Sequence, residues 1–385
     1  MSTFDVAIVG GGVIGVSIAF ELAAEKLRVV VLDRQQPGQE ASWAAAGMLS
    51  PAPDSPRDIP LAPLGRESLS LYPQFVAAVE EESGKSASYA RDGSIEVLLA
   101  PHGEIDRDQK VAEYRLLDLT AEGISLSAAR KREASITPDA RAAVWLPEEA
   151  TVEPRMLMSA LLAAAQNRGV VIRPDAPVTG LICEQNRCLG VIAAGEKIVA
   201  SHVVVAAGCF SGDIANGVGH LARFLPTRPV RGQMLALRHN AFNLSRVLRS
   251  EHGYLVPRRD GRIVAGSTKE EAGFEKRVTA AGIRKLLDAA IELCPVLTGA
   301  EIVETWSGLR PGTPDDLPIL GPTDIEGLLI ATGHYRNGIL LTPVTAKLIR
   351  DWIARGQASS EAFDVATFSP LRFDRGNLSS RAETA

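Results

Sequence analysis

Two stretches of this chain combine residue types and spacings that could do chemistry, and the first is VGGGVIG. Its Gly10, Gly12 and Gly15 have the spacing G-x-G-x-x-G. The first glycine permits a tight turn, the second lets the backbone approach a pyrophosphate, and the third allows a helix to pack closely on a strand. Asp33 ends the next apolar run, where its carboxylate can accept hydrogen bonds from an adenosine ribose. These residues predict a dinucleotide site, with a glycine-rich turn that binds no ligand as the alternative.

The glycine pattern does not choose the dinucleotide, because NAD and FAD share this cradle. Asp33 argues only against NADP. Farther along the chain, residues 40–51 read EASWAAAGMLSP. This run of small residues suits a backbone that lies flat against a large planar ring, although small residues also pack helices.

The second stretch is TGHYRNGILLTPVTAKLI, residues 332–349, in which polar side chains stand just before an apolar helix. The polar group consists of His334, Tyr335, Arg336 and Asn337. A surface loop with a helix cap explains them, since Gly, Asn and His are common in turns and caps. The alternative is a helix N-terminus directed at a bound anion, because its free N–H groups and its dipole favour negative charge.

The elements that must hold these stretches follow an α/β pattern. The apolar FDVAIV, the glycine turn, the helical VSIAFELAAEK and the apolar RVVVLD predict a strand, a turn, a helix and a second strand, which is a βαβ unit. A helix is predicted at 154–169, where Gly169 is a fitting stop. The run HVVVAAG at 202–208 predicts another buried strand of the same sheet.

A second, mostly antiparallel sheet is predicted by GSIEVLLA, VRGQMLALR, GYLVPRRDGRIVAGST and EIVETWSGLRPG. Asp260 and Gly261 form a hairpin turn signal in the third of these segments. Its helices include 279–293, which begins after a Thr279 N-cap and ends before Pro295. The expected fold is α/β, with a Rossmann-like dinucleotide-binding domain interleaved with an α+β substrate domain built on the antiparallel sheet.

The composition of the chain argues against several kinds of partner and cofactor. The 385-residue chain has a formal net charge of −5 and no basic stripe, so nucleic acid and anionic membranes are not expected partners. Its four cysteines form no C-x-x-C pair and lie near no metal-like His spacing, which indicates reduced thiols and no metal site. The N-terminus lacks the basic residues of a signal peptide, and no run reaches the roughly 18 apolar residues of a membrane span. A soluble cytoplasmic protein is therefore expected.

Six segments, taken in order, resemble the glycine oxidase branch of the D-amino acid oxidase family across nearly the whole chain. They are VGGGVIG, SWAAAGMLSP, VVVAAGCFSG, HGYLVPRRDGRIVAGST, WSGLRPGTPDDLPILGP and GHYRNGILLTPVTAKLI. The resemblance implies FAD as the cofactor and a two-domain fold in which one sheet roofs the flavin. No cysteine lies in a segment that resembles the covalent attachment sites of sarcosine oxidases, so the FAD is expected to be non-covalent.

The resemblance also implies roles for individual residues. Arg310 matches the arginine that pairs with the substrate carboxylate, and Tyr254 matches the tyrosine beside it. A guanidinium offers the planar fork that a carboxylate requires, and a phenol adds a neutral donor. The alternative for Arg310 is a structural arginine braced by Asp315 or Asp316.

Four more residues are placed near the substrate by the same resemblance. His252 and Met48 match pocket-lining positions, although each could be a packing residue. Arg336 is expected to strengthen the field of the helix N-terminus that faces the flavin and stabilises its reduced, negatively charged form. Lys269 departs from the family pattern, in which an apolar residue often follows GxT, and leaves the polarity of that pocket wall open.

The cofactor-binding residues implied by the resemblance come from every part of the chain. They are Gly10, Gly12, Val13, Ile14, Gly15, Asp33, Arg34, Ser42, Ala45, Ala46, Gly47, Met48, Val178, Ala207, Gly208, Arg310, His334, Arg336, Asn337, Gly338, Ile339 and Leu340. The FAD-binding domain is expected over 1–84, 150–222 and 318–375, the substrate-binding domain over 85–149 and 223–317, and a flexible tail over 376–385.

The expected activity is oxidative deamination of glycine and other small amines, such as sarcosine and D-alanine, by hydride transfer to FAD with reduction of O2 to H2O2. No G-x-S-x-G elbow or H-E-x-x-H motif is present, so the flavin is left to do the chemistry. A D-amino acid oxidase or dehydrogenase and a sarcosine-type oxidase remain alternatives, and a non-catalytic FAD-binding module is a more remote one. The resemblance further suggests a homotetramer and a role in thiamine thiazole synthesis.

Overall fold

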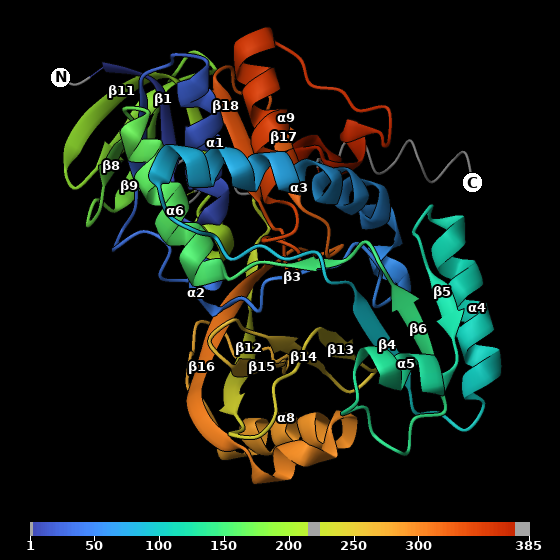
Figure 1. The fold of residues 1–385 in the computed structure, drawn as a ribbon. Helices are drawn as coiled ribbons and strands as arrows, with labels where there is room; N and C mark the ends of the chain where they lie inside the picture. The colour runs from blue at the N-terminus through green and yellow to red at the C-terminus, as the bar shows by residue number, and fades with distance from the viewer. Residues whose placement is uncertain (1–2, 215–223, 374–385) are drawn as a thin grey trace.

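Two eight-stranded sheets form the framework of the protein in a computed structural model that describes residues 3–214 and 224–373 (Figure 1). The first sheet has the order β17 (Ile319–Pro322), β18 (Leu328–Thr332), β11 (Glu196–Val205), β1 (Thr3–Val9), β2 (Val29–Leu32) and β8 (Val171–Arg173). It is extended by β10 (Arg187–Ala193), which pairs with β11, and by β9 (Val178–Glu184). The tail expected at 376–385 lies outside the described residues.

The centre of the first sheet is parallel, as the βαβ reading predicts. β1 pairs in parallel with both β2 and β11, and β18 pairs in parallel with β11. Val6, Ala7 and Ile8 are fully buried, because helices or strands cover both faces of a parallel strand. The glycine loop therefore leaves the sheet at the carboxyl end of a central strand.

The second sheet has the order β16 (Glu301–Gly312), β12 (Arg228–Arg238), β15 (Arg262–Gly266), β14 (Tyr254–Pro257), β13 (Val247–Arg249), β4 (Ser94–Leu98), β6 (Ala142–Leu146) and β5 (Glu122–Ile124). Its pairings are antiparallel except that between β13 and β4, which confirms the prediction of a mostly antiparallel sheet. A short ladder of β3 (Met48–Leu49) and β7 (Ala150–Thr151) stands apart from both sheets.

Nine helices accompany the sheets in the described residues. They are α1 (Val13–Ala24), α2 (Ala41–Ala44), α3 (Ala62–Ser83), α4 (Gly103–Leu116), α5 (Leu126–Arg132), α6 (Pro154–Asn167), α7 (Ser211–Ile214), α8 (Ala280–Leu293) and α9 (Thr342–Arg355). Helices α1, α3, α6 and α9 meet over the first sheet, α8 packs on the second, and α2 lines the space between them. Short 3-10 turns lie at η1 (Pro56–Leu61), η2 (Gly208–Phe210), η5 (Pro295–Gly299), η6 (Val365–Phe368) and η7 (Pro370–Phe373). No helix in 3–214 or 224–373 is long and apolar enough to cross a membrane.

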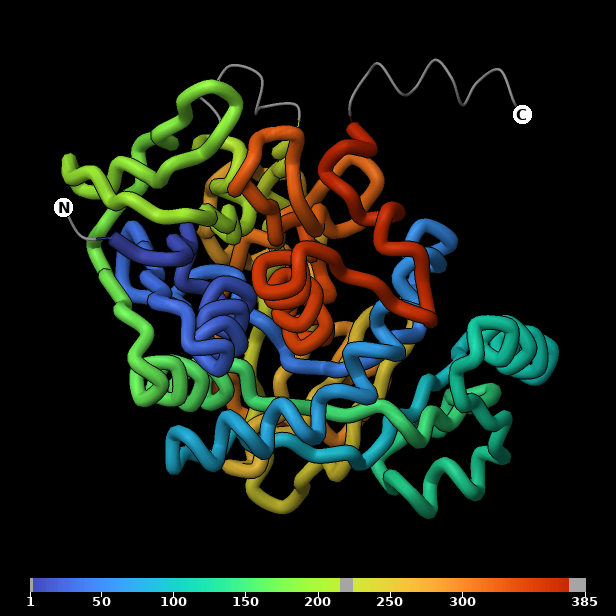
Figure 2. The backbone as a smooth tube through the Cα atoms, turned by 90° about the horizontal axis from the view of Figure 1, so that it is seen from above, coloured from blue at the N-terminus to red at the C-terminus, as the bar shows by residue number. Residues whose placement is uncertain are grey.

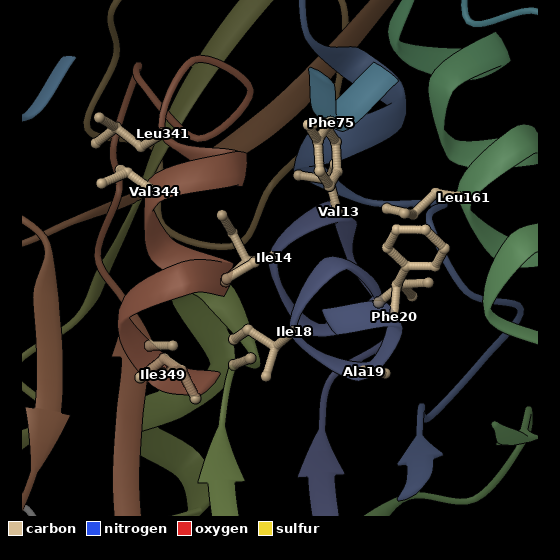
Figure 3. Close-up of a cluster of buried hydrophobic side chains, with 14 of the residues drawn as sticks. Val13, Ile14, Ile18, Ala19, Phe20, Phe75, Leu161, Leu341, Val344 and Ile349 are labelled. Atoms are coloured by element: carbon tan, nitrogen blue, oxygen red, sulfur yellow. The ribbon is translucent and has the colours of Figure 1, made fainter. Parts of the chain in front are cut away.

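The largest core lies where α1, α3, α6 and α9 meet over the first sheet (Figure 3). Helix α1 is apolar around its circumference because it is enclosed on all sides: Ile18 lies toward α9, and Phe20 lies toward α3 and α6. Figure 2 shows α1 and α9, from opposite ends of the chain, side by side. Burial of this cluster fixes the start of α1 against the start of α9.

Helix α8 packs on the second sheet and begins as its sequence predicts. The Thr279 hydroxyl oxygen accepts a hydrogen bond from the Gly282 amide at 3.1 Å, which is an N-cap contact. Leu286, Ala290 and Leu293 turn inward and join the core under the sheet. Figure 1 shows α8 beneath this sheet, on the side away from the first sheet. The exact domain boundaries stay a prediction.

Candidate functional site

A cavity of about 410 Å³ runs between the two sheets, from the glycine loop to the strand β16. Its wall combines the carboxyl ends of β1, β2 and β18 with the small-residue segment after α2 and with inward side chains of the second sheet. In open parallel sheets, ligands bind at the carboxyl ends of the strands. The cavity therefore lies where the fold predicts a ligand.

The glycine loop has the close contacts that the motif requires. Gly10 has φ +109°, and a Cβ atom there would lie 2.4 Å from the carbonyl oxygen of Ala206. A larger residue is excluded at this turn for both reasons. The Val13 amide, at the start of α1, donates to the Ser42 hydroxyl at 2.9 Å. The helix N-terminus and Ser42 together present polar groups to the cavity.

Asp33 stands at the end of β2 and lines the same cavity. Its Oδ2 accepts from the Gly11 amide at 2.7 Å, and its Oδ1 accepts from the Gln35 amide at 3.0 Å. Burial raises the pKa of this carboxyl group, against the lowering effect of the two amide bonds. The carboxylate is held at the glycine loop and keeps lone pairs for further donors.

The walls on either side of Asp33 are lined by other residues expected to bind the cofactor. Arg34 lies flat on Phe210, with its Cζ 3.5 Å from the ring centroid, and pairs with Glu40 at 2.7 Å. Across the cavity, Val178, Ala207 and Gly208 complete this end. An aromatic and aliphatic wall of this kind suits a purine.

The segment from Ala45 to Met48 runs along the middle of the cavity wall. Gly47 has φ +74°, and a Cβ atom there would lie 2.0 Å from the Val152 carbonyl oxygen. Arg258 donates to the Ala46 carbonyl at 2.6 Å, which holds the segment against the second sheet. The small side chains leave a flat wall, as the sequence predicts.

Arg310 is a cation in the cavity wall without an acidic partner in the part of the chain that the structure describes. Its Nη1 donates to the Thr268 carbonyl at 3.1 Å, and its Nη2 donates to the Ser267 hydroxyl at 2.6 Å. Burial lowers its pKa, and the neighbouring Tyr254 and Tyr335 oppose that effect. A Cβ atom at Gly232 would lie 2.3 Å from the guanidinium nitrogens, so this glycine leaves room for it.

The two acids considered as braces for Arg310 are engaged elsewhere. Asp315 pairs with Arg372 at 2.8 Å, and Asp316 pairs with Arg228 at 3.3 Å. Tyr254, in β14, lines the cavity close to Arg310, and its hydroxyl lies 3.7 Å from the Met234 sulfur. Arg310 and Tyr254 are thus brought together on one wall, together with Met48.

Residues 334–341 also line the cavity and lead into α9. His334 is buried, with Nε2 3.0 Å from the Thr345 hydroxyl, and burial lowers its pKa to about 3, so the ring is neutral. The Leu341 amide donates to the Asn337 carbonyl at 2.8 Å, which makes a turn ahead of the helix. Asn337, Gly338, Ile339 and Leu340 all line the cavity.

Arg336 lines the cavity but is already paired with two carboxylates. Its Nη2 lies 2.5 Å from Asp54 Oδ2 and 3.3 Å from Asp58 Oδ2. Burial alone would lower the pKa of Arg336, but the two acids outweigh it and the pKa is raised. The positive field expected from this side chain is therefore partly cancelled by acids that the sequence reasoning did not select.

Three residues that the sequence analysis placed at the site, Gly15, His252 and Lys269, do not line the cavity. Gly15 is buried in α1, and a Cβ atom there would lie 1.9 Å from the Gly10 carbonyl oxygen, so it serves helix packing rather than cofactor contact. His252 is exposed, with Nδ1 2.7 Å from Glu292. His252 stands two residues before Tyr254, so in a continuous strand both side chains would lie on the same face. The chain instead turns between Ser250 and Gly253, and His252 lies toward α8.

Tyr335 belongs to the polar group named in the sequence analysis, but it was given no role at the site. It lines the cavity, it is 6% exposed, and its hydroxyl has no hydrogen-bond partner in the described residues. Its backbone amide donates to the Pro311 carbonyl at 3.0 Å, next to Arg310. Its position inside the polar group 334–337 was a signal, but a tyrosine in a loop has many structural uses.

The donors and shape of this cavity fit an FAD molecule. The glycine loop and the start of α1 suit a pyrophosphate, Asp33 suits a ribose, and the flat segment 45–48 suits an isoalloxazine ring. A buried phenol without a partner and a cation without an acid then remain for a second ligand. Within the described ranges, no group of three or more His, Cys, Asp or Glu could hold a metal ion.

Comparisons with known proteins agree with this geometry. A family model described as "DAO: FAD dependent oxidoreductase" matches residues 5–352. The chain is 38% identical to the bifunctional protein ThiO/ThiG of Trichormus variabilis over 91% of its own length and 53% of that protein. It is 34% identical to the glycine oxidase of Pseudomonas putida, with 95% and 98% of the two chains covered.

A solved structure shares the whole fold. The crystal structure of glycine oxidase from Geobacillus kaustophilus matches with a TM-score of 0.89 at 32% identity, over 97% of this chain and 99% of that one. The chain spans about half the length of the bifunctional relatives and nearly all of the glycine oxidases.

Proposed function

The chain belongs to the DAO family of FAD-dependent oxidoreductases, and from this premise we propose that it oxidises glycine and other small amines. The observation that carries the proposal is Arg310: a partly buried guanidinium, without an acidic partner in the described chain, in the same cavity as the glycine loop. Glycine, sarcosine and D-alanine are the proposed substrates. A D-amino acid oxidase or dehydrogenase and a sarcosine-type oxidase remain the alternatives.

The residues that would hold FAD are those of the cavity wall already described. The glycine loop and the start of α1 would hold the pyrophosphate, and Asp33 would accept hydrogen bonds from the ribose. FAD, when bound, supplies the two-electron acceptor that takes a hydride from the substrate and later reduces dioxygen to hydrogen peroxide. Cys209 lines the cavity, but burial raises its thiol pKa to about 12, which supports non-covalent attachment.

The chain's own contribution to the reaction is orientation. Arg310 binds the substrate carboxylate through its two-pronged guanidinium, and Tyr254 adds a neutral donor. With the carboxylate fixed there, the carbon that bears the amine would face segment 45–48. The substrate is then held in one orientation for the reaction, which lowers the entropic cost of reaching the transition state. The neutral His334 and the turn before α9 would place backbone donors beside a bound flavin.

The overall conversion balances without a further co-reactant. Glycine, dioxygen and water yield glyoxylate, ammonia and hydrogen peroxide. The amine loses two electrons and becomes an imine, and water then hydrolyses the imine. We further propose that the imine or its product serves thiamine thiazole synthesis, as the name ThiO of the bifunctional relatives suggests.

We also propose a cytoplasmic location and a homo-oligomer. All four cysteines are free thiols, which is common in reducing compartments. The strand β16 is an edge of the second sheet and carries Ile302 and Val303, which are 47% and 37% exposed. An edge with exposed apolar side chains favours contact with a second copy.

A spectrum of the purified protein tests the proposed function. We expect visible flavin absorbance that acid precipitation releases completely, and anaerobic addition of glycine should bleach it. A colourless protein would contradict FAD binding, and colour left in the acid pellet would contradict non-covalent attachment. A yellow protein that no small amine bleaches would favour the non-catalytic module.

A further inference from the structure

Three cationic side chains surround the buried ring of Tyr335. The Lys269 ammonium lies 5.3 Å from the ring centroid, and the Arg336 Cζ lies 6.0 Å from it. Arg310 is close enough for the phenol to act on it electrostatically. The Tyr335 hydroxyl itself has no hydrogen-bond partner in the described chain. The phenol therefore marks an electropositive corner of the cavity.

The charges in this corner do not cancel within the described residues. Arg336 is neutralised by Asp54 and Asp58. Neither Arg310 nor Lys269 has a carboxylate within ion-pair distance in ranges 3–214 and 224–373. Two positive charges are thus left for a ligand to neutralise.

The acids nearest to Lys269 along the chain are not available to it. Glu270 pairs with Arg231 and accepts from Gln233, and Glu271 pairs with Arg228 at 2.6 Å. Lys269 is exposed to solvent and does not itself line the cavity, but its ammonium lies 5.3 Å from the ring centroid of Tyr335, which does.

One short segment holds both unneutralised cations in place. Arg310 donates to the Ser267 hydroxyl and to the Thr268 carbonyl, and Lys269 is the next residue. Any ligand bound to Arg310 therefore lies close to the peptide that carries Lys269. A monocarboxylate can neutralise Arg310 alone, whereas a ligand with two anionic groups can reach both.

We propose that this enzyme prefers amines that carry a second anionic group, which pairs with Lys269 while the first carboxylate pairs with Arg310. The proposal rests on the proposed amine oxidation and specifies its substrate class. The second carboxylate can be attached to the nitrogen, as in iminodiacetate, or to the side chain, as in D-aspartate. An ion pair at the edge of solvent is modest, and it corresponds to a preference of about three- to fivefold.

Kinetics of the holoenzyme test this preference. The ratio of kcat/KM for iminodiacetate, and for D-aspartate, to that for glycine is measured in the native chain and in Lys269→Met. We expect the ratio for at least one dicarboxylate to fall about three- to fivefold in Lys269→Met. Lys269→Arg should retain the native ratio, because the charge is kept, and Lys285→Met, an exposed lysine on α8, should leave it unchanged.

A binding measurement separates this proposal from the proposed oxidation. Malonate and acetate, which cannot be oxidised as amines, are titrated into the holoprotein and their Kd values compared by calorimetry. We expect malonate to bind more tightly than acetate, with the advantage reduced about three- to fivefold in Lys269→Met. Equal malonate-to-acetate ratios in the native chain and in Lys269→Met would overturn the second-anion site. Failure of every amine to turn over would count against the oxidase proposal and leave this binding comparison decisive.

Discussion

At the scale of single residues, Arg310 is the side chain that bears most directly on substrate binding. A partly buried guanidinium without an acid is costly to maintain, since removal from water disfavours the charged form. Its two hydrogen bonds, to a carbonyl and a hydroxyl, position the group without neutralising it. Such a group is explained by a ligand that brings a negative charge, and the substrate carboxylate is that ligand in our proposal.

Removing the charge of Arg310 should weaken substrate binding and turnover and leave the fold intact. We expect Arg310→Ala to remain folded and yellow but to lose roughly 3–5 kcal/mol of substrate interaction, as when one partner of a buried ion pair is deleted. That corresponds to a loss of about 10² to several times 10³ in kcat/KM. Arg310→Lys should not restore the native rate, because one ammonium cannot make a two-pronged contact. Arg284→Ala, on the exposed side of α8, serves as the control; native kinetics in Arg310→Ala would assign the carboxylate to another residue, with Arg336 the first to test.

At the other end of the cavity, Asp33 is expected to contribute to the affinity for FAD. Asp33→Ala removes a charged acceptor from the ribose and from the Gly11 amide, and each such hydrogen bond contributes roughly 1.5–3 kcal/mol. We expect weaker FAD retention, measured by titrating the apoprotein with FAD and following the flavin fluorescence. Asp33→Asn keeps an acceptor oxygen, so its affinity for FAD should lie between those of the native chain and Asp33→Ala. Unchanged FAD affinity in Asp33→Ala would exclude the residue from the cofactor site.

Sequence reasoning predicted individual residues well where the backbone geometry requires a glycine. Gly10 and Gly47 lie at positive φ in tight contact; the motif spacing predicts Gly10, and the resemblance of the segment SWAAAGMLSP predicts Gly47. It failed where the outcome depends on a chain turn or a distant partner. His252 leaves the cavity at a turn, and Arg336 meets Asp54 and Asp58, whose proximity no local pattern reveals.

At the scale of elements, local signals predicted helices and strands well. The predicted helix 154–169 corresponds to α6, and the first four residues of the run HVVVAAG form the end of β11. The predicted hairpin at Asp260 and Gly261 joins β14 to β15. Pairing partners far apart in sequence, such as β13 with β4, could not be predicted, because no local residue specifies them.

The N-cap of α8 offers a test of an element. The Thr279 hydroxyl accepts from Gly282 and from the Gln233 amide group, so Thr279→Ala leaves two donors without an acceptor. We expect a loss of about 1 kcal/mol in the free energy of unfolding, measured by urea denaturation. Thr279→Ser keeps the oxygen and should recover nearly all of it. A loss in Thr279→Ser as large as in Thr279→Ala would show that the methyl packing, not the cap, matters.

At the scale of the whole molecule, the cavity exists because the chain passes repeatedly between the two sheets. Residues 45–48, 310 and 334–341 are far apart in sequence and line one cavity. The alternation of parallel and antiparallel segments predicted this interleaving, and the family resemblance predicted the cavity's occupant. The charge balance at Tyr335 could not be predicted, since it depends on which acids each cation meets in three dimensions.

The pH dependence of stability should reflect the buried His334. Its folded pKa, about 3, lies below the ordinary value of 6.5, so the unfolded chain binds the extra proton between these values. This contribution to stability is complete above pH 6.5 and is lost as the pH falls toward 3, by up to about 1.4 kcal/mol per pH unit. We expect urea denaturation of His334→Gln to depend less on pH than that of the native chain between pH 6.5 and 4. If the free energies of unfolding of the two proteins changed equally with pH, the pKa of His334 would be the same in the folded and unfolded chains, and the prediction would be wrong.

The most direct test of the account is a peroxide-coupled assay across a panel of amines. Glycine, sarcosine, D-alanine, L-alanine and larger D-amino acids are compared in kcat/KM with the FAD-loaded protein. We predict turnover of the three small amines and failure of L-alanine, because fixing its carboxylate on Arg310 and its amine in place turns the Cα–H away from the flavin. Robust oxidation of L-alanine, or none of glycine, sarcosine and D-alanine, would contradict the assignment.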